Sequence, residues 1–275
     1  MPGVGADTGS TLNFTLMQYH QSLARLQRIM EELRTGCPWD KKQTIGTLRP
    51  LSIEETYELA DAITAGDWEG IKEESGDILL HLVFYALIAR EQGKFSFEDV
   101  IEGICNKLVN RHPHIYGSVQ VKDDEDVKRN WEQIKLGENG GKKKSILGGV
   151  PKGLPAMVKA LRLQEKTKTV GFEWDHIDQV KAKVEEELGE LYEAVESKDA
   201  AHIEEEMGDV FFALINYSRF AGIDPEGALE RTNLKFIRRF KAMEEIAAGQ
   251  NKSLHTMPLE AQDALWNEVK RAERT

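Results

Sequence analysis

Apolar residues along the chain recur mostly three and four positions apart, which is the spacing of one face of an α-helix. No stretch alternates apolar and polar residues over the length of a β-strand. The pattern therefore predicts an all-α fold. We place helices at 14–35, 51–66, 67–92, 97–110, 124–137, 155–168, 175–197, 199–221, 225–248 and 258–273.

Two of these helices have recognisable start signals. Ser52 and Glu55 have the spacing of a capping box, so we expect a helix to begin beside them. Asp224 followed by Pro225 is typical of an N-cap and a first helical residue. The longest apolar run, at 78–89, is too short for a membrane span, which needs about 20 residues. We therefore expect no contact with a membrane.

Two halves of the chain repeat each other across a Gly- and Lys-rich segment at 137–153, which has the composition of a linker. The motif GCPWD at 36–40 is similar to the motif GFEWD at 171–175. Five acids recur at an offset of 132 residues: Glu54, Glu55, Glu58, Glu74 and Asp77 become Glu186, Glu187, Glu190, Glu206 and Asp209. We expect a disordered tail over 1–13, a helical domain over 14–120, a helix and linker over 121–153, and a second helical domain over 154–275.

Some of the repeated acids lie where a helix should be apolar. Glu187 projects into the apolar stripe of its helix and Glu190 lies at the edge of that stripe. An unpaired buried carboxylate costs several kcal/mol, so a positive partner is needed. Oxygen ligands suit a hard cation such as Mg²⁺. We therefore predict that the repeated acids bind metal in both halves of the chain. The ligands are the first acid set (Glu55, Glu58, Glu74, Asp77) and the second acid set (Glu187, Glu190, Glu206, Asp209).

Not every acid in these helices needs a metal. Solvated acidic helix faces are common, and Glu185, Glu193 and Glu204 fit that interpretation. A ferritin-like di-iron site would need Glu-x-x-His, where this chain has Asp77 and Asp209. The net charge of −11, from 36 basic and 47 acidic residues, argues against a nucleic-acid partner. Two cysteines without metal-ligand spacing, and no signal peptide, predict a cytoplasmic protein.

Several motifs occur in a recognisable order: GCPWDKKQT, NRHPHIYG, WEQIK and NLKFIRRF, together with the doubled acids. From about residue 20 to its end, the chain resembles the MazG family of tandem-domain nucleoside triphosphate pyrophosphohydrolases. The resemblance implies Mg²⁺-dependent hydrolysis of nucleoside triphosphates to the monophosphate and pyrophosphate, as house-cleaning of the nucleotide pool. It also implies an all-α homodimer whose helices pack across the two subunits, with activity in the C-terminal copy.

The family pattern, carried onto this sequence, names further site residues. It implies that Glu186, Glu187 and Glu190 are catalytic, and that Glu186 or Glu187 polarises the attacking water. It implies substrate contacts at Lys135, Glu186, His202, Glu205, Lys235, Arg239, Trp266 and Lys270. Relatives often have Lys at the position of His202.

The two halves also differ. At the same offset, Gly103 matches Lys235 whereas Lys107 matches Arg239, which favours the second half as the catalytic one. Alternatives are a nucleotide-binding regulatory protein without turnover, a pyrophosphohydrolase of an alarmone such as ppGpp, and a structural helical protein.

Overall fold

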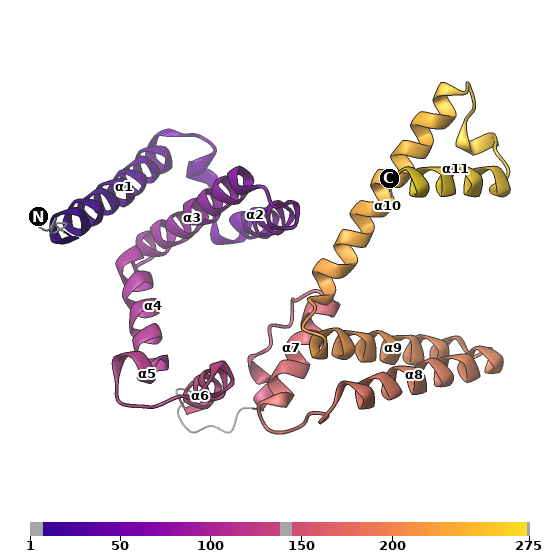
Figure 1. The fold of residues 1–275 in the computed structure, drawn as a ribbon. Helices are drawn as coiled ribbons and strands as arrows, with labels where there is room; N and C mark the ends of the chain where they lie inside the picture. The colour runs from indigo at the N-terminus through magenta and orange to yellow at the C-terminus, as the bar shows by residue number, and fades with distance from the viewer. Residues whose placement is uncertain (1–7, 138–144, 274–275) are drawn as a thin grey trace, which may run out of the picture. The chain divides into compact units, whose positions relative to one another are not determined.

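The computed structural model describes residues 8–137 and 145–273, and within these ranges its regular secondary structure is helical, as predicted (Figure 1). The α-helices before the gap are α1 (Thr8–Gly36), α2 (Ile45–Ala65), α3 (Trp68–Glu91), α4 (Phe97–Arg111), α5 (Pro113–Tyr116) and α6 (Asp124–Gly137). Those after it are α7 (Ala156–Lys168), α8 (Ile177–Ser197), α9 (Ala200–Phe220), α10 (Pro225–Gly249) and α11 (Leu259–Ala272). Short 3₁₀ helices lie at Asp40–Lys42, Ile146–Gly149 and Leu254–Thr256. None of the described helices is long and apolar enough to cross a bilayer.

The chain forms two compact units that divide between Asp123 and Asp124. Helices α1 to α5 belong to the first unit and α6 to α11 to the second. Helix α6 was expected in a separate segment with the linker, and its contacts group it with the second unit instead. Helix α1 begins at Thr8, inside the range expected to be a tail, and residues 1–7 and 138–144 lie outside the described residues.

The predicted start of the second helix at Ser52 is wrong. Helix α2 begins at Ile45, where Thr44 and Thr47 form the capping box. Ser52 lies inside the helix, and its hydroxyl donates to the carbonyl of Leu48 and bonds to the hydroxyl of Tyr85 at 2.8 Å. The Ser-x-x-Glu pattern at Ser52 therefore lies inside the helix, because Thr44 and Thr47 form the capping box further upstream.

Two helical hairpins, α2–α3 and α8–α9, carry the repeated acids. In each hairpin a two-residue turn ends in an aspartate that caps the next helix. Asp67 accepts hydrogen bonds from the amides of Glu69 and Gly70, and Asp199 accepts one from Ala201. Such caps satisfy amides that have no partner within the helix. The short turns hold the two helices of each hairpin antiparallel and in contact.

Each unit buries its own apolar cluster. In the first unit α1, α2 and α3 meet around Phe84, together with Met30, Leu48, Val83, Leu87 and Ile88. In the second unit α10 packs on α11 through Met243, Ala247, Leu265 and Val269. The α8–α9 hairpin buries Val180, Leu191, Ala194, Val210, Ala213 and Ile215. These contacts hold the helices that carry the candidate site.

Candidate active site

The α8–α9 hairpin gathers three carboxylates of the second acid set. Glu187 on α8 and Glu206 and Asp209 on α9 each offer an oxygen, and these oxygens lie within 4.8 Å of one another. Glu206 and Asp209 share a helix face because they are three positions apart. Glu187 is only 7% exposed, in keeping with its place in the apolar stripe. The hairpin therefore concentrates negative charge beside a buried surface.

Glu190 lies one turn further along α8 and is not part of this trio. Its side chain is exposed, and its pKa is raised by a hydrogen bond to Glu187, by partial loss of hydration and by the charge of Glu187. Two carboxyls that share a hydrogen bond favour one proton between them. The structure therefore links all four acids, three directly and Glu190 through Glu187.

A lysine that the sequence did not single out touches this site. The ammonium of Lys183 lies 2.8 Å from a carboxylate oxygen of Glu187 and 2.8 Å from one of Glu186. These bonds, the one to Glu186 first, raise the pKa of Lys183. The available signal was a basic residue four positions before Glu187, although most such pairs are ordinary surface contacts.

His202 also lies beside the acids. Its Nε2 is 3.2 Å from a carboxylate oxygen of Glu206. The family pattern placed His202 among the substrate contacts, and in this structure its side chain lies beside Glu206, a predicted metal ligand. Glu205, the neighbour of Glu206, is exposed to solvent.

The first acid set forms a similar cluster on α2–α3. Oxygens of Glu55, Glu58 and Glu74 lie within 4.8 Å of one another, and Asp77 is outside this trio. Burial, aided by the charges of Asp77, Glu58 and Glu74, raises the pKa of Glu55 to about 7. Crowded carboxylates repel one another, so the protonated form becomes easier to populate.

Both trios fit a hard divalent cation by their chemistry. Each offers three carboxylate oxygens from two antiparallel helices, and Mg²⁺ and Ca²⁺ bind such oxygen donors. Burial first, and then the charges of Asp77, Glu58 and Glu74, raise the pKa of Glu55 and so disfavour its ionised form. A bound cation would remove that repulsion.

The four predicted substrate contacts of α10 and α11 are only partly brought together. Arg239 lies over the ring of Trp266 at 5.6 Å and pairs with Glu273 at 2.7 Å. Phe236 packs against the same ring at 5.2 Å. Among the described residues, no hydrogen bond or ion pair joins Lys235, Arg239, Trp266 or Lys270 to the second acid set.

The remaining predicted contact, Lys135, lies on α6, which belongs to the same unit as the second acid set. Its ammonium sits over the ring of Trp131 at 5.3 Å. The sequence placed this lysine outside the C-terminal domain.

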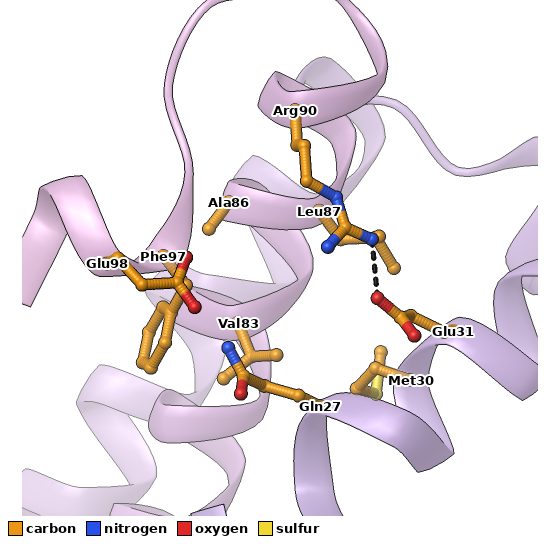
Figure 2. A pocket seen from close by; sticks show the side chains of 9 residues that line it. All are labelled: Gln27, Met30, Glu31, Val83, Ala86, Leu87, Arg90, Phe97 and Glu98. Carbon is orange, nitrogen blue, oxygen red and sulfur yellow. Dashed lines mark hydrogen bonds and ion pairs between the residues drawn. The ribbon is translucent and has the colours of Figure 1, made fainter. Parts of the chain in front are cut away.

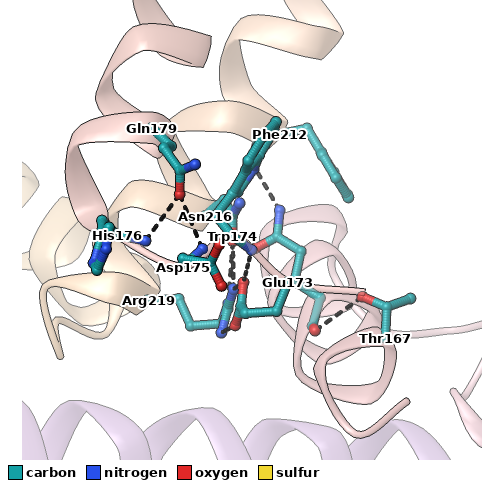
Figure 3. A network of polar contacts seen from close by, with 10 residues as sticks. Thr167, Glu173, Trp174, Asp175, His176, Gln179, Phe212, Asn216 and Arg219 are labelled. Atoms are coloured by element: carbon teal, nitrogen blue, oxygen red, sulfur yellow. Dashed lines mark hydrogen bonds and ion pairs between the residues drawn. The ribbon is translucent and has the colours of Figure 1, made fainter. Parts of the chain in front are cut away.

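A polar network fixes the segment GFEWD at the start of the α8–α9 hairpin (Figure 3). Arg219 of α9 donates to both carboxylate oxygens of Glu173 at 2.7 Å, and both side chains are largely buried. The side-chain oxygen of Gln179 accepts from the amides of Asp175 and His176. The sequence analysis identified GFEWD because it matches GCPWD in the first half. In the structure, these contacts join the segment before α8 to α9.

A shallow pocket lies elsewhere, in the first unit between α1, α3 and the start of α4 (Figure 2). Glu31 and Arg90 form an ion pair of 2.5 Å across it. Neither acid set lines it. We therefore assign the chemistry to the acidic hairpins and not to this pocket.

Comparison with known proteins agrees with the duplicated hairpins. The profile of the family described as the MazG nucleotide pyrophosphohydrolase domain matches residues 43–116 and 176–244. The chain is 42% identical over 255 residues to a nucleoside triphosphate pyrophosphohydrolase of Escherichia coli (strain K12), covering 90% of this chain and 97% of that protein. It is 45% identical over 252 residues to the nucleoside triphosphate pyrophosphohydrolase/pyrophosphatase MazG of Thermotoga maritima, covering 91% and 96%. Against YabN of Bacillus subtilis, which is uncharacterized, it is 45% identical over 259 residues, covering 93% of this chain and 53% of that one.

Proposed function

The chain belongs to the MazG nucleotide pyrophosphohydrolase family, and from that premise we propose that it hydrolyses nucleoside triphosphates between the α- and β-phosphates. The products are the nucleoside monophosphate and pyrophosphate. The observation that carries the proposal is the gathering of Glu187, Glu206 and Asp209 on one hairpin. Bare carboxylates would repel a triphosphate, so this arrangement suits the substrate only with a cation between them.

Mg²⁺ is the cation we propose for this site. Glu187, Glu206 and Asp209 would hold it, with Glu190 joining from the next turn of α8. When bound, Mg²⁺ supplies positive charge to phosphate oxygens and polarises a water molecule. The first acid set would hold the same ion in the other half.

The residues of the chain divide the remaining work. The oxygen of a water molecule forms a bond to the α-phosphorus. The bond between the α-phosphorus and the oxygen that links it to the β-phosphorus breaks. Glu186 or Glu187 accepts the proton of the water, and Lys235 and Arg239 neutralise the departing pyrophosphate. Trp266 offers its ring to the base, and Lys135, His202, Glu205 and Lys270 complete the contacts.

We assign catalysis to the second half. Lys235 presents a second cation beside Arg239 on α10, whereas Gly103 occupies the matching position on α4. Two cations on one helix face suit a triphosphate better than one. The first half then has a structural or regulatory role.

We also propose that the protein works as a homodimer. Large apolar side chains on the helices of the second unit face solvent in the single chain, among them Tyr192, Phe211, Phe212 and Phe236. Large exposed apolar patches mark interaction surfaces. Packing of a second copy over these helices would cover them and could bring cations of α10 toward the acids. Light scattering after size-exclusion chromatography tests this, and a monomeric mass at micromolar concentration would contradict it.

The function is tested by resolving the products of each triphosphate incubated with the protein, with Mg²⁺ or with EDTA. We expect equal amounts of monophosphate and pyrophosphate, and only with Mg²⁺. A diphosphate with inorganic phosphate would show that a different bond is cleaved. Saturable binding without product would favour a regulatory nucleotide-binding protein.

A further inference from the structure

A cation of the chain itself contacts one member of the second acid set, Glu187. Lys183 and Glu187 approach to 2.8 Å, and the side chain of Glu187 is only 9% exposed. Glu187 is also the α8 member of the carboxylate trio with Glu206 and Asp209. The same carboxylate therefore serves an internal ion pair and the predicted metal site.

The first half lacks this cation. Leu51 occupies the position of Lys183 in the repeat, four residues before Glu55, and packs against the apolar cluster around Phe84. The repeated acids are otherwise the same in both halves. The lysine is thus a specific difference between two sites of otherwise similar composition.

Lys183 can release Glu187 without becoming unpaired. Its ammonium also lies 2.8 Å from Glu186, whose side chain is exposed. A small rotation of a flexible lysine side chain keeps the second bond while it opens the first. An ammonium and a divalent cation cannot both stay close to one carboxylate oxygen without mutual repulsion.

We propose that Lys183 is a built-in counter-ion of the second acid set and competes with the divalent cation for Glu187. This inference rests on the proposed function, because it takes Glu187 as a metal ligand. In the absence of metal, Lys183 neutralises the buried acid. When the metal binds, Lys183 turns to Glu186, so the second acid set binds free metal more weakly than its carboxylates alone would.

The test measures Mg²⁺ binding by titration calorimetry without nucleotide, so that no turnover contributes. The full chain carries Glu55→Gln and Glu58→Gln to disable the first acid set. In this background Lys183→Met, which keeps the aliphatic stem, should tighten Mg²⁺ binding about tenfold, the weight of one partly buried ion pair. Its melting temperature in EDTA should fall, and Mg²⁺ should restore it.

Lys181→Met is the matched control. Lys181 pairs with Glu185 at 3.6 Å on the same helix, and both side chains are well exposed. This variant removes the same charge away from the trio, so its Mg²⁺ affinity should stay within about twofold of the parent.

The outcomes separate the inference from the function on which it rests. Unchanged or weaker Mg²⁺ binding in Lys183→Met, with binding intact in the parent, would overturn the competition alone. Binding detected only after Lys183→Met would support it strongly. No Mg²⁺ binding in either protein would overturn the metal assignment, and the inference with it.

Discussion

Gly66 and Lys198 close the same turn in the two hairpins, 132 residues apart in the sequence. Both have left-handed backbone, with φ of 70° and 60°. Their amides donate back to the carbonyls of Ile63 and Val195, which ends each helix in the same way. Glycine adopts this conformation freely, whereas a side chain costs about 1 kcal/mol there.

The exchange of these turn residues should therefore change stability in opposite directions. We expect Lys198→Gly to raise the free energy of unfolding by about 0.5 kcal/mol, because relief of strain exceeds the added freedom of the unfolded chain. Gly66→Ala should lower it by about 1 kcal/mol. Urea unfolding of both variants measures this, and a loss of stability in Lys198→Gly would contradict the strain.

The assignment of catalysis to the second half predicts unequal effects of the same double substitution. Glu187→Ala with Glu190→Ala should reduce turnover by at least about 1,000-fold, since the cation would lose its buried ligand. Glu55→Ala with Glu58→Ala should leave the rate within about threefold, because that hairpin lacks the partner cations of α10. Pyrophosphate release under saturating Mg²⁺ measures both, and equal losses would refute the assignment.

Helical spacing was enough to predict the all-α fold and most helix ranges, because amphipathic faces repeat along the chain. It did not predict that α2 begins at Ile45, since Thr44 and Thr47 compete with Ser52 as capping residues. The doubled acids located both hairpins. Spacing could not decide that Glu190 and Asp77 stand outside their trios, because side-chain rotamers decide this.

Lys183 was missed for a related reason. A comparison of the two halves finds what they share, and the first half has Leu51 at this position. Only the burial of Glu187 distinguishes its ion pair from the exposed pair of Lys181 and Glu185 on the same helix. The apolar stripe already predicted the burial of Glu187, but the approach of the Lys183 ammonium to it depends on side-chain rotamers, which helical spacing does not specify.

The raised pKa of Glu55 predicts a pH dependence of stability in EDTA. The folded value is about 7 and the ordinary value is 4.5, so the folded state holds the proton more tightly. The stabilisation is fully present below pH 4.5 and is lost as the pH rises through 7. Glu55→Gln should remove this loss and stabilise the protein at pH 8 by about 1–2 kcal/mol, allowing for solvent screening.

Chemical unfolding at pH 5 and pH 8 measures this effect. The neighbouring Glu54 is exposed and lies outside the trio, so Glu54→Gln serves as the control. The control should follow the parent at both pH values. If the unfolding free energy of Glu55→Gln changed between pH 5 and pH 8 as that of the parent does, the crowding of Glu55 with Glu58, Glu74 and Asp77 would not be present in solution.

Arg238 and Arg239 offer a matched test of the predicted substrate contact on α10. Both pair with Glu273, at 2.8 Å and 2.7 Å, but only Arg239 lies over Trp266. If Arg239 meets the phosphates beside a base stacked on Trp266, Arg239→Gln should lower kcat/KM by about tenfold or more. Arg238→Gln should change it by less than about twofold, because that side chain is mostly exposed.

Steady-state rates with ATP and Mg²⁺ measure both variants. Equal losses would mean that the arginines act through Glu273 and the docking of α11, and that Arg239 has no contact of its own with the substrate.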